Sequence, residues 1–142
     1  MKRFFTAIVF LILLVACDKD TPRNNNPYLP SYNFSATLNL NLPLYSNLNS
    51  NLNATPVTVD GDIDVVIMKV GGTDFRAWNG NCPNHAPTGC SRLSASGITA
   101  KCNCEDGFTY SAFTGIGSTG SRYNMIPYHV QVIDNSTIRV YN

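Results

Sequence analysis

Two short cysteine-rich stretches decide the fold: GNCPNHAPTGC at residues 80–90 and KCNCEDGFTY at residues 101–110. Together they hold four of the five cysteines of the chain and one of its two histidines. Each stretch has a cysteine near its start and a glycine further on, a pattern that predicts a pair of loops facing each other. We expect the preceding residues to build the sheet that carries these loops, and the following residues to close it.

The composition narrows the class of protein before any motif is considered. The chain has 142 residues, which indicates a single domain. Charged residues make up 13% and the net charge is +1, so the sequence lacks the basic surface that nucleic-acid binding requires. Asn, Ser, Thr and Gly are abundant and strong helix formers are sparse in the body of the chain. This composition favours an all-β fold.

The N-terminus has the features of a processing signal. Lys2 and Arg3 precede an apolar run over residues 4–15, which is shorter than the roughly 20 residues that a membrane span needs. The run ends in LVAC at residues 14–17, which resembles a bacterial lipobox. The resemblance implies that residues 1–16 are removed and that Cys17 is lipidated. The alternative is an ordinary secretory signal cut near Ala16, which leaves Cys17 free.

Residues 17–30 read as a tether between the lipid and a domain at 31–142. This segment is rich in proline and asparagine and has almost no apolar content, so it cannot bury enough surface to offset the entropy of ordering. We therefore expect a protein attached by lipid to a membrane of the bacterial cell envelope, facing the periplasm or the cell surface. Lipidation of Cys17 leaves an even number of cysteines, four, in an oxidising compartment.

Within the domain, apolar and polar residues alternate in many short segments. Residues 34–42 alternate with a clean period of two, which predicts a half-buried strand. Residues 44–55 carry Leu44, Leu48 and Leu52, and we expect a loop pinned by these leucines, with one or two helical turns as the alternative. Further strands are predicted at 63–70, 75–78, 98–101, 108–113, 128–132 and 137–141. Short strands at this spacing predict a small barrel or sandwich.

The order of these features resembles a Rieske iron–sulfur domain. A strand is followed by Cys82-x-x-His85 and Cys90, then by Cys102-x-Cys104, a Gly-x-x-Tyr string and a closing hairpin. In that family each loop gives one cysteine and one histidine to a [2Fe–2S] cluster. The resemblance implies that Cys82, His85 and Cys102 occupy ligand positions, and that Cys90 and Cys104 form a disulfide between the loops.

The chain departs from the family pattern in both loops. The first loop has one residue more between Cys82 and His85 than the family's Cys-x-His, which moves the imidazole by about 3.5 Å along an extended chain. In the second loop the family's histidine falls at Glu105. The second histidine of the chain, His129, lies in a predicted strand beyond both loops. The two-cysteine, two-histidine ligand set is therefore incomplete.

Two hypotheses follow directly from the incomplete ligand set. In the first, no cofactor is bound, Cys90–Cys104 is the implied loop disulfide, and Cys82 and Cys102 form a second disulfide across the vacant site. In the second, a [2Fe–2S] cluster is retained and Glu105 or Asp106 replaces the missing histidine.

A third hypothesis is a single zinc ion held by Cys82, His85, Cys102 and Cys104. We expect the first hypothesis to hold: an all-β, Rieske-like domain with no catalytic residues, serving as a non-enzymatic binding or structural module. The alternative function is a [2Fe–2S] electron-transfer protein or redox subunit with a non-histidine ligand. No protein partner can be read from the sequence.

Overall fold

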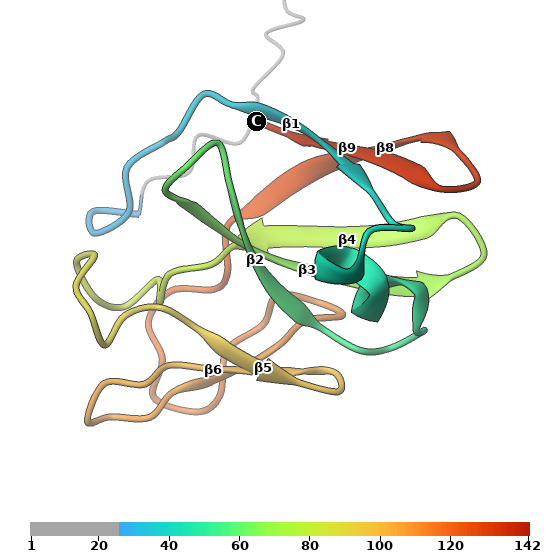
Figure 1. Cartoon of the computed structure of the whole chain (residues 1–142). Helices are drawn as coiled ribbons and strands as arrows, with labels where there is room; N and C mark the ends of the chain where they lie inside the picture. The colour runs from blue at the N-terminus through green and yellow to red at the C-terminus, as the bar shows by residue number, and fades with distance from the viewer. Residues whose placement is uncertain (1–25) are drawn as a thin grey trace, which may run out of the picture.

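The computed structural model describes residues 26–142, which form an all-β domain of two sheets (Figure 1). The expected signal peptide, Cys17 and residues 18–25 of the tether lie outside the described residues. In chain order the elements are β1 (Ser35–Asn39), the 3₁₀ helix η1 (Pro43–Asn49), β2 (Thr55–Val59), β3 (Ile63–Gly71), β4 (Asp74–Asn79), β5 (Ser94–Ser96), β6 (Thr99–Lys101), β7 (Thr109–Ser111), β8 (Pro127–Asp134) and β9 (Thr137–Tyr141). The predicted all-β class is confirmed.

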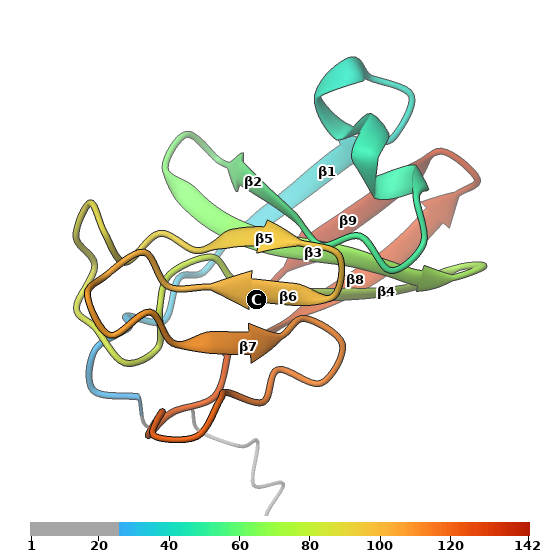
Figure 2. The same cartoon turned by 90° about the horizontal axis from the view of Figure 1, so that it is seen from below.

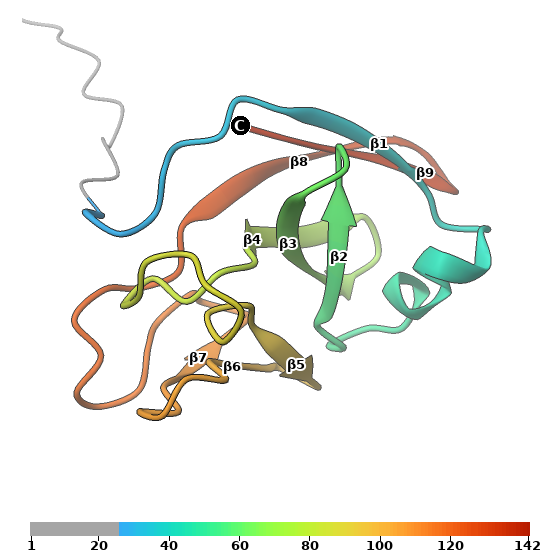
Figure 3. The same ribbon diagram turned by 60° about the vertical axis from the view of Figure 1, so that its left-hand side comes forward.

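The larger sheet is antiparallel and has six strands in the order β1-β9-β8-β4-β3-β2. Its two halves join where β4 pairs with β8, through Ala77 opposite Tyr128 and Trp78 opposite Pro127. Every one of its strands contributes side chains to one apolar core, so the sheet curls into a nearly closed barrel around it (Figure 3). This arrangement agrees with the small barrel predicted from the alternating segments.

Strand β3 is covered on both faces, which explains its unbroken apolar sequence. Val65 and Ile67 point into the barrel core, whereas Val66 and Met68 belong to a second apolar cluster. All four side chains have 0% exposure. The second cluster lies between β3, β4 and the smaller sheet, and it includes Cys82, Cys102 and Tyr110.

The smaller sheet consists of β5, β6 and β7, paired antiparallel in that order (Figure 2). The first cysteine loop connects β4 to β5 and the second connects β6 to β7. The end of β6 lies next to the start of β5 and the start of β7. Both loops therefore lie at the same end of this sheet (Figure 2). The small sheet thus places the two loops side by side, as the sequence predicts.

The structure differs from the prediction in a few segments. The loop expected over 44–55 contains η1, and of its leucines Leu48 is buried while Leu44 and Leu52 are exposed. Strands β2 and β5 had no predicted counterpart. At the end of the expected tether, Asn26 Nδ2 donates to the Pro83 carbonyl at 2.8 Å, so the chain contacts the first loop there. Between residues 26 and 142, no helix is long and apolar enough to cross a membrane.

Candidate functional site

The first loop is closed at its base by backbone hydrogen bonds. The amide of Leu93 donates to the Gly80 carbonyl at 2.8 Å, and the amide of Cys82 donates to the Ser91 carbonyl at 2.7 Å. A Cβ atom on Gly80 would lie 2.6 Å from the carbonyl carbon of Asp64 in β3. Glycine therefore lets the start of the loop run directly against the backbone of the barrel. This close approach fixes the depth at which the Cys82 side chain enters the second core.

The second loop is closed in the same way and is joined to the first. The amide of Cys102 donates to the Phe108 carbonyl at 2.8 Å, and that of Gly107 donates to the Cys104 carbonyl at 3.0 Å, which makes residues 104–107 a tight turn. Between the loops, Asn103 Nδ2 donates to the Arg92 carbonyl at 2.8 Å. Both loops therefore hold fixed positions relative to each other.

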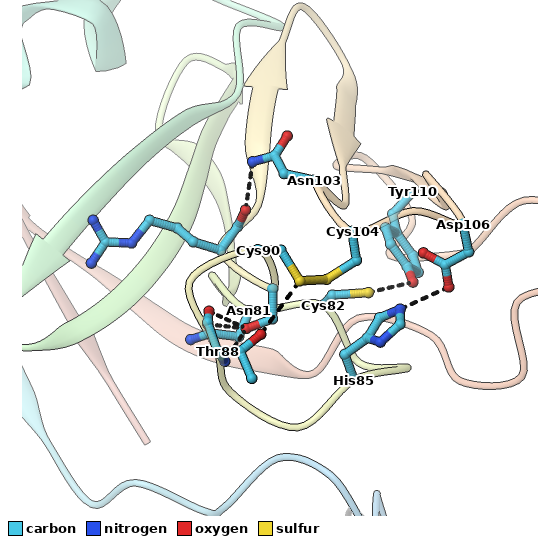
Figure 4. The surroundings of a disulfide bond; sticks show 11 residues. Asn81, Cys82, His85, Thr88, Cys90, Asn103, Cys104, Asp106 and Tyr110 are labelled. Carbon is cyan, nitrogen blue, oxygen red and sulfur yellow. Dashed lines mark hydrogen bonds and ion pairs between the residues drawn. A yellow bond between two sulfur atoms is a disulfide. The ribbon is translucent and has the colours of Figure 1, made fainter.

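A disulfide between Cys90 and Cys104 provides the covalent link between the loops (Figure 4). The Cα atoms are 4.8 Å apart, within the range of ordinary disulfides. This is the pair that the Rieske resemblance implied. It also removes Cys104 from any metal site, so the zinc hypothesis with Cys104 as a ligand is wrong.

Cys82 and Cys102 are free thiols, and each has 0% exposure. The second disulfide expected between them is therefore not formed in this structure. Together with His85 they make a compact group, because one ligand atom from each residue lies within 4.8 Å of the other two. The structure thus brings together three of the four predicted ligand residues.

The fourth predicted residue, Glu105, is exposed and is not part of this group. The adjacent acid takes the position facing His85: Asp106 Oδ2 lies 2.7 Å from His85 Nε2 (Figure 4). The side chains of this pair are 33% and 29% exposed, in contrast to the buried thiols. Of the two consecutive acids in the turn at 104–107, Asp106 is the one that contacts the imidazole.

Two further polar residues contact the group, and the sequence analysis missed both of them as site residues. Asn84 Nδ2 donates to the Tyr110 hydroxyl at 2.8 Å, and the same hydroxyl is hydrogen-bonded to Cys82 Sγ at 3.3 Å. Asn84 Oδ1 accepts from the amides of Arg122 and Tyr123 at 2.9 and 3.0 Å. Asn84 is the extra residue of the first loop, and its side chain attaches that loop to residues 122–123.

Burial controls the protonation of the sulfur side of the site. It raises the pKa of the Cys102 thiol to about 12, with a smaller contribution from the hydrogen bond to Cys82. Burial also raises the pKa of Tyr110 well above its usual range, and the hydrogen bond to Cys82 makes a smaller contribution in the same direction. At neutral pH, Cys102 is therefore a neutral thiol and Tyr110 a neutral phenol in the described structure.

The second histidine, His129, lies on β8 and is not part of the group formed by Cys82, His85 and Cys102. It is exposed on β8 and stacks on Tyr141, with ring centroids 5.2 Å apart. Its place on β8 confirms the strand predicted at 128–132.

No protein-family model matches the chain, and no curated protein matches it either. Among solved structures, the chain is similar to the ferredoxin of carbazole 1,9a-dioxygenase from Nocardioides aromaticivorans IC177, with 21% identity over 67% of this chain and 91% of the other and a TM-score of 0.45. It is also similar to a structure described as an NADH-dependent nitrite reductase small subunit from Mycobacterium tuberculosis, with 16% identity over 79% and 97% of the two chains and a TM-score of 0.47. At these TM-scores the likeness supports neither a family assignment nor a function.

Proposed function

We propose that this chain is a non-enzymatic binding module of the bacterial cell envelope, held at a membrane by a lipid on Cys17. Its binding site lies between the two loops that the Cys90–Cys104 disulfide joins. The observation that carries the proposal is the composition of the site: two buried thiols, one imidazole, and a carboxylate engaged with that imidazole. The membrane attachment rests on the lipobox-like residues 14–17.

The residues present do not fit a Rieske-type [2Fe–2S] cluster. That cluster takes two cysteines on one iron and two histidines on the other, and this site gathers a single histidine. Asp106 is not a ready replacement, because its Oδ2 lies 2.7 Å from His85 Nε2. Two ligands about 2.0–2.1 Å from one tetrahedral metal would be about 3.4 Å apart. The observed spacing is that of a hydrogen bond, so the pair does not have the geometry of two ligands on one iron.

A second candidate function, an electron carrier that keeps a cluster with a carboxylate ligand, has one observation in its favour. Cys82 and Cys102 are unpaired thiols, as cluster ligands would need to be, and they are not closed into a disulfide. In that case Asp106 would have to leave His85 and become the fourth ligand. The anionic ligand would lower the reduction potential relative to two imidazoles.

The two functions are separated by the iron and acid-labile sulfide content of the full chain, isolated without reconstitution. We expect neither element at stoichiometric levels and no visible absorption. Two irons and two sulfides per chain would refute the proposed function and establish the electron carrier. The Asp106→His variant is the matched positive control, because it places a second imidazole opposite His85. Iron and sulfide uptake by this variant and not by wild type would locate the defect at residue 106.

A further inference from the structure

We propose that the site between the loops binds a single zinc-like divalent ion through Cys82, Cys102 and His85, with Asp106 orienting the imidazole and the fourth coordination position left open. The inference rests on the proposed function, because it requires a binding site free of an iron–sulfur cluster. It differs from the sequence-based zinc hypothesis in its ligand set, since Cys104 is in a disulfide.

The three donor residues match a single thiophilic ion in type and in spacing. Zinc binds cysteine sulfur at about 2.3 Å and histidine nitrogen at about 2.0–2.1 Å, which places donors in a tetrahedral site about 3.5–3.8 Å apart. Cys82 Sγ, Cys102 Sγ and one ring nitrogen of His85 already lie within 4.8 Å of one another. A contraction of about 1 Å brings them to the distances of a tetrahedral site. Two sulfurs and one nitrogen select zinc-like ions over magnesium or calcium, which prefer oxygen ligands.

Asp106 supplies the support that a metal-binding histidine normally needs. A histidine ligand usually donates its other ring N–H to a carboxylate or carbonyl group, which fixes its tautomer and its orientation. In this chain Nε2 of His85 faces Asp106 Oδ2 at 2.7 Å, so Nδ1 is the nitrogen left to bind an ion. Asp106 is therefore a positioning residue, which acts on the ion through His85.

Among the described residues, no fourth ligand joins Cys82, His85 and Cys102, which leaves the fourth position open. Tyr110 and Asn84 hydrogen-bond to each other, and Tyr110 contacts Cys82 Sγ at 3.3 Å from the buried side. The His85–Asp106 pair is about one third exposed, so solvent reaches this side of the group. Three protein ligands with one open position is the arrangement of zinc sites that bind water or a small ligand. Binding replaces the two thiol protons, which pass to solvent, so the charge of the ion is balanced by two thiolates.

The test measures metal binding by the full chain isolated under anaerobic conditions without reductant, with Zn²⁺ and Co²⁺ as probes and Mg²⁺ as the negative ion. We expect about one zinc per chain and the release of about two protons on binding. We also expect absorption from cobalt–thiolate bonds with Co²⁺. His85→Gln should weaken binding and His129→Gln should not. Because a serine at a buried cysteine position can disturb folding, the cobalt–thiolate absorption of wild type is the test for sulfur ligands.

The positioning role is tested with the two neighbouring acids. Asp106→Ala should weaken zinc binding about 10- to 100-fold, as is typical for the loss of a partner of a metal-bound histidine, whereas Glu105→Ala should leave it unchanged. Asp106→Asn keeps an acceptor oxygen for the imidazole and should retain most of the zinc affinity. If Asp106 acted only through its negative charge, this variant would lose affinity as Asp106→Ala does. Equal losses in the Glu105 and Asp106 alanine variants would overturn the assignment of Asp106.

Failure of this inference is distinguishable from failure of the proposed function. A chain without iron or sulfide that binds neither zinc nor cobalt overturns the inference and leaves the binding module intact. A Cys82–Cys102 disulfide in the anaerobically isolated chain has the same consequence. Stoichiometric iron and sulfide overturn both.

Discussion

Replacing Cys90 and Cys104 together with serine should lower the free energy of unfolding by about 3 kcal/mol. The two cysteines are 14 residues apart in the sequence, and a disulfide that closes a loop of about 15 residues contributes about 3 kcal/mol in the chain-entropy account. Domains of this size have a total stability of about 5–15 kcal/mol. The variant should therefore remain folded but lose a large share of its margin.

Equilibrium urea unfolding, followed by the fluorescence of Trp78, measures this loss. The indole N–H donates to the Ala112 carbonyl at 2.7 Å in a buried hydrogen bond, so its environment reports the packing of the barrel against the β7 side of the small sheet. Wild type treated with a thiol reductant is the matched control, because reduction opens the same bond without changing the sequence. Reductant should bring wild type to the stability of the variant and should leave the variant itself unchanged.

Two outcomes would contradict the reasoning about the disulfide. A loss below about 0.5 kcal/mol would show that hydrogen bonds between the loops, such as that from Asn103 to the Arg92 carbonyl, already hold them together without the covalent bond. A further loss when reductant is added to the variant would show that another disulfide supports the fold. That result would conflict with the free thiols of Cys82 and Cys102.

Three further predictions concern the barrel contact, the alkaline stability and the anchor. Gly80→Ala should destabilise the domain by about 1–3 kcal/mol in urea unfolding, since its Cβ would lie 2.6 Å from the Asp64 carbonyl carbon. The control is Gly89→Ala, whose Cβ has no neighbour within 4 Å and which should leave the free energy of unfolding unchanged. Burial raises the pKa of Tyr128 from 10.0 to about 12. The free energy of unfolding that depends on its neutral phenol, about 3 kcal/mol, is therefore fully present below pH 10 and is lost as the pH rises through 12. Tyr128→Phe should accordingly lose less stability than wild type between pH 10 and 12. At pH 7 this variant is destabilised by about 1–3 kcal/mol, because Asn79 Nδ2 loses its 2.9 Å acceptor. Equal losses of stability in both proteins between pH 10 and 12 would refute the raised pKa of Tyr128. Cys17→Ser should move the protein out of the membrane fraction or stall its processing, and a variant that still floats with membranes at the wild-type level would rule out the lipid anchor.

The strands that sequence reasoning found are those whose burial follows a local pattern. Residues 34–42 alternate because one face of β1 meets the barrel core, and β3 is apolar throughout because both its faces are covered. Strand β2 was missed because it contains Pro56, which it tolerates as an edge strand of the larger sheet. Strand β5, with the sequence Ser-Ala-Ser, has no pattern of its own and exists through its pairing with β6.

The candidate site shows a similar division between local and tertiary information. The pairing of Cys90 with Cys104 and the ligand positions of Cys82, His85 and Cys102 came from the family resemblance, and the structure brings them together. The partner of His85 depends on the direction of side chains in the turn at 104–107. The family resemblance put the missing histidine at Glu105 and left Glu105 or Asp106 as its replacement, and the turn places Asp106 opposite the imidazole.

The contact between Asn26 and Pro83 has a consequence for the orientation of the domain at a bilayer. It fixes the point where the chain meets the domain beside the first cysteine loop. Asn26 lies nine positions after Cys17, and a fully extended chain covers at most about 3.6 Å per position, or about 32 Å in all. A lipid on Cys17 would therefore keep the loop end of the domain within one small-protein diameter of the membrane surface. Ions or proteins that use this site would then approach it from the side, through the layer of solvent next to the lipid headgroups.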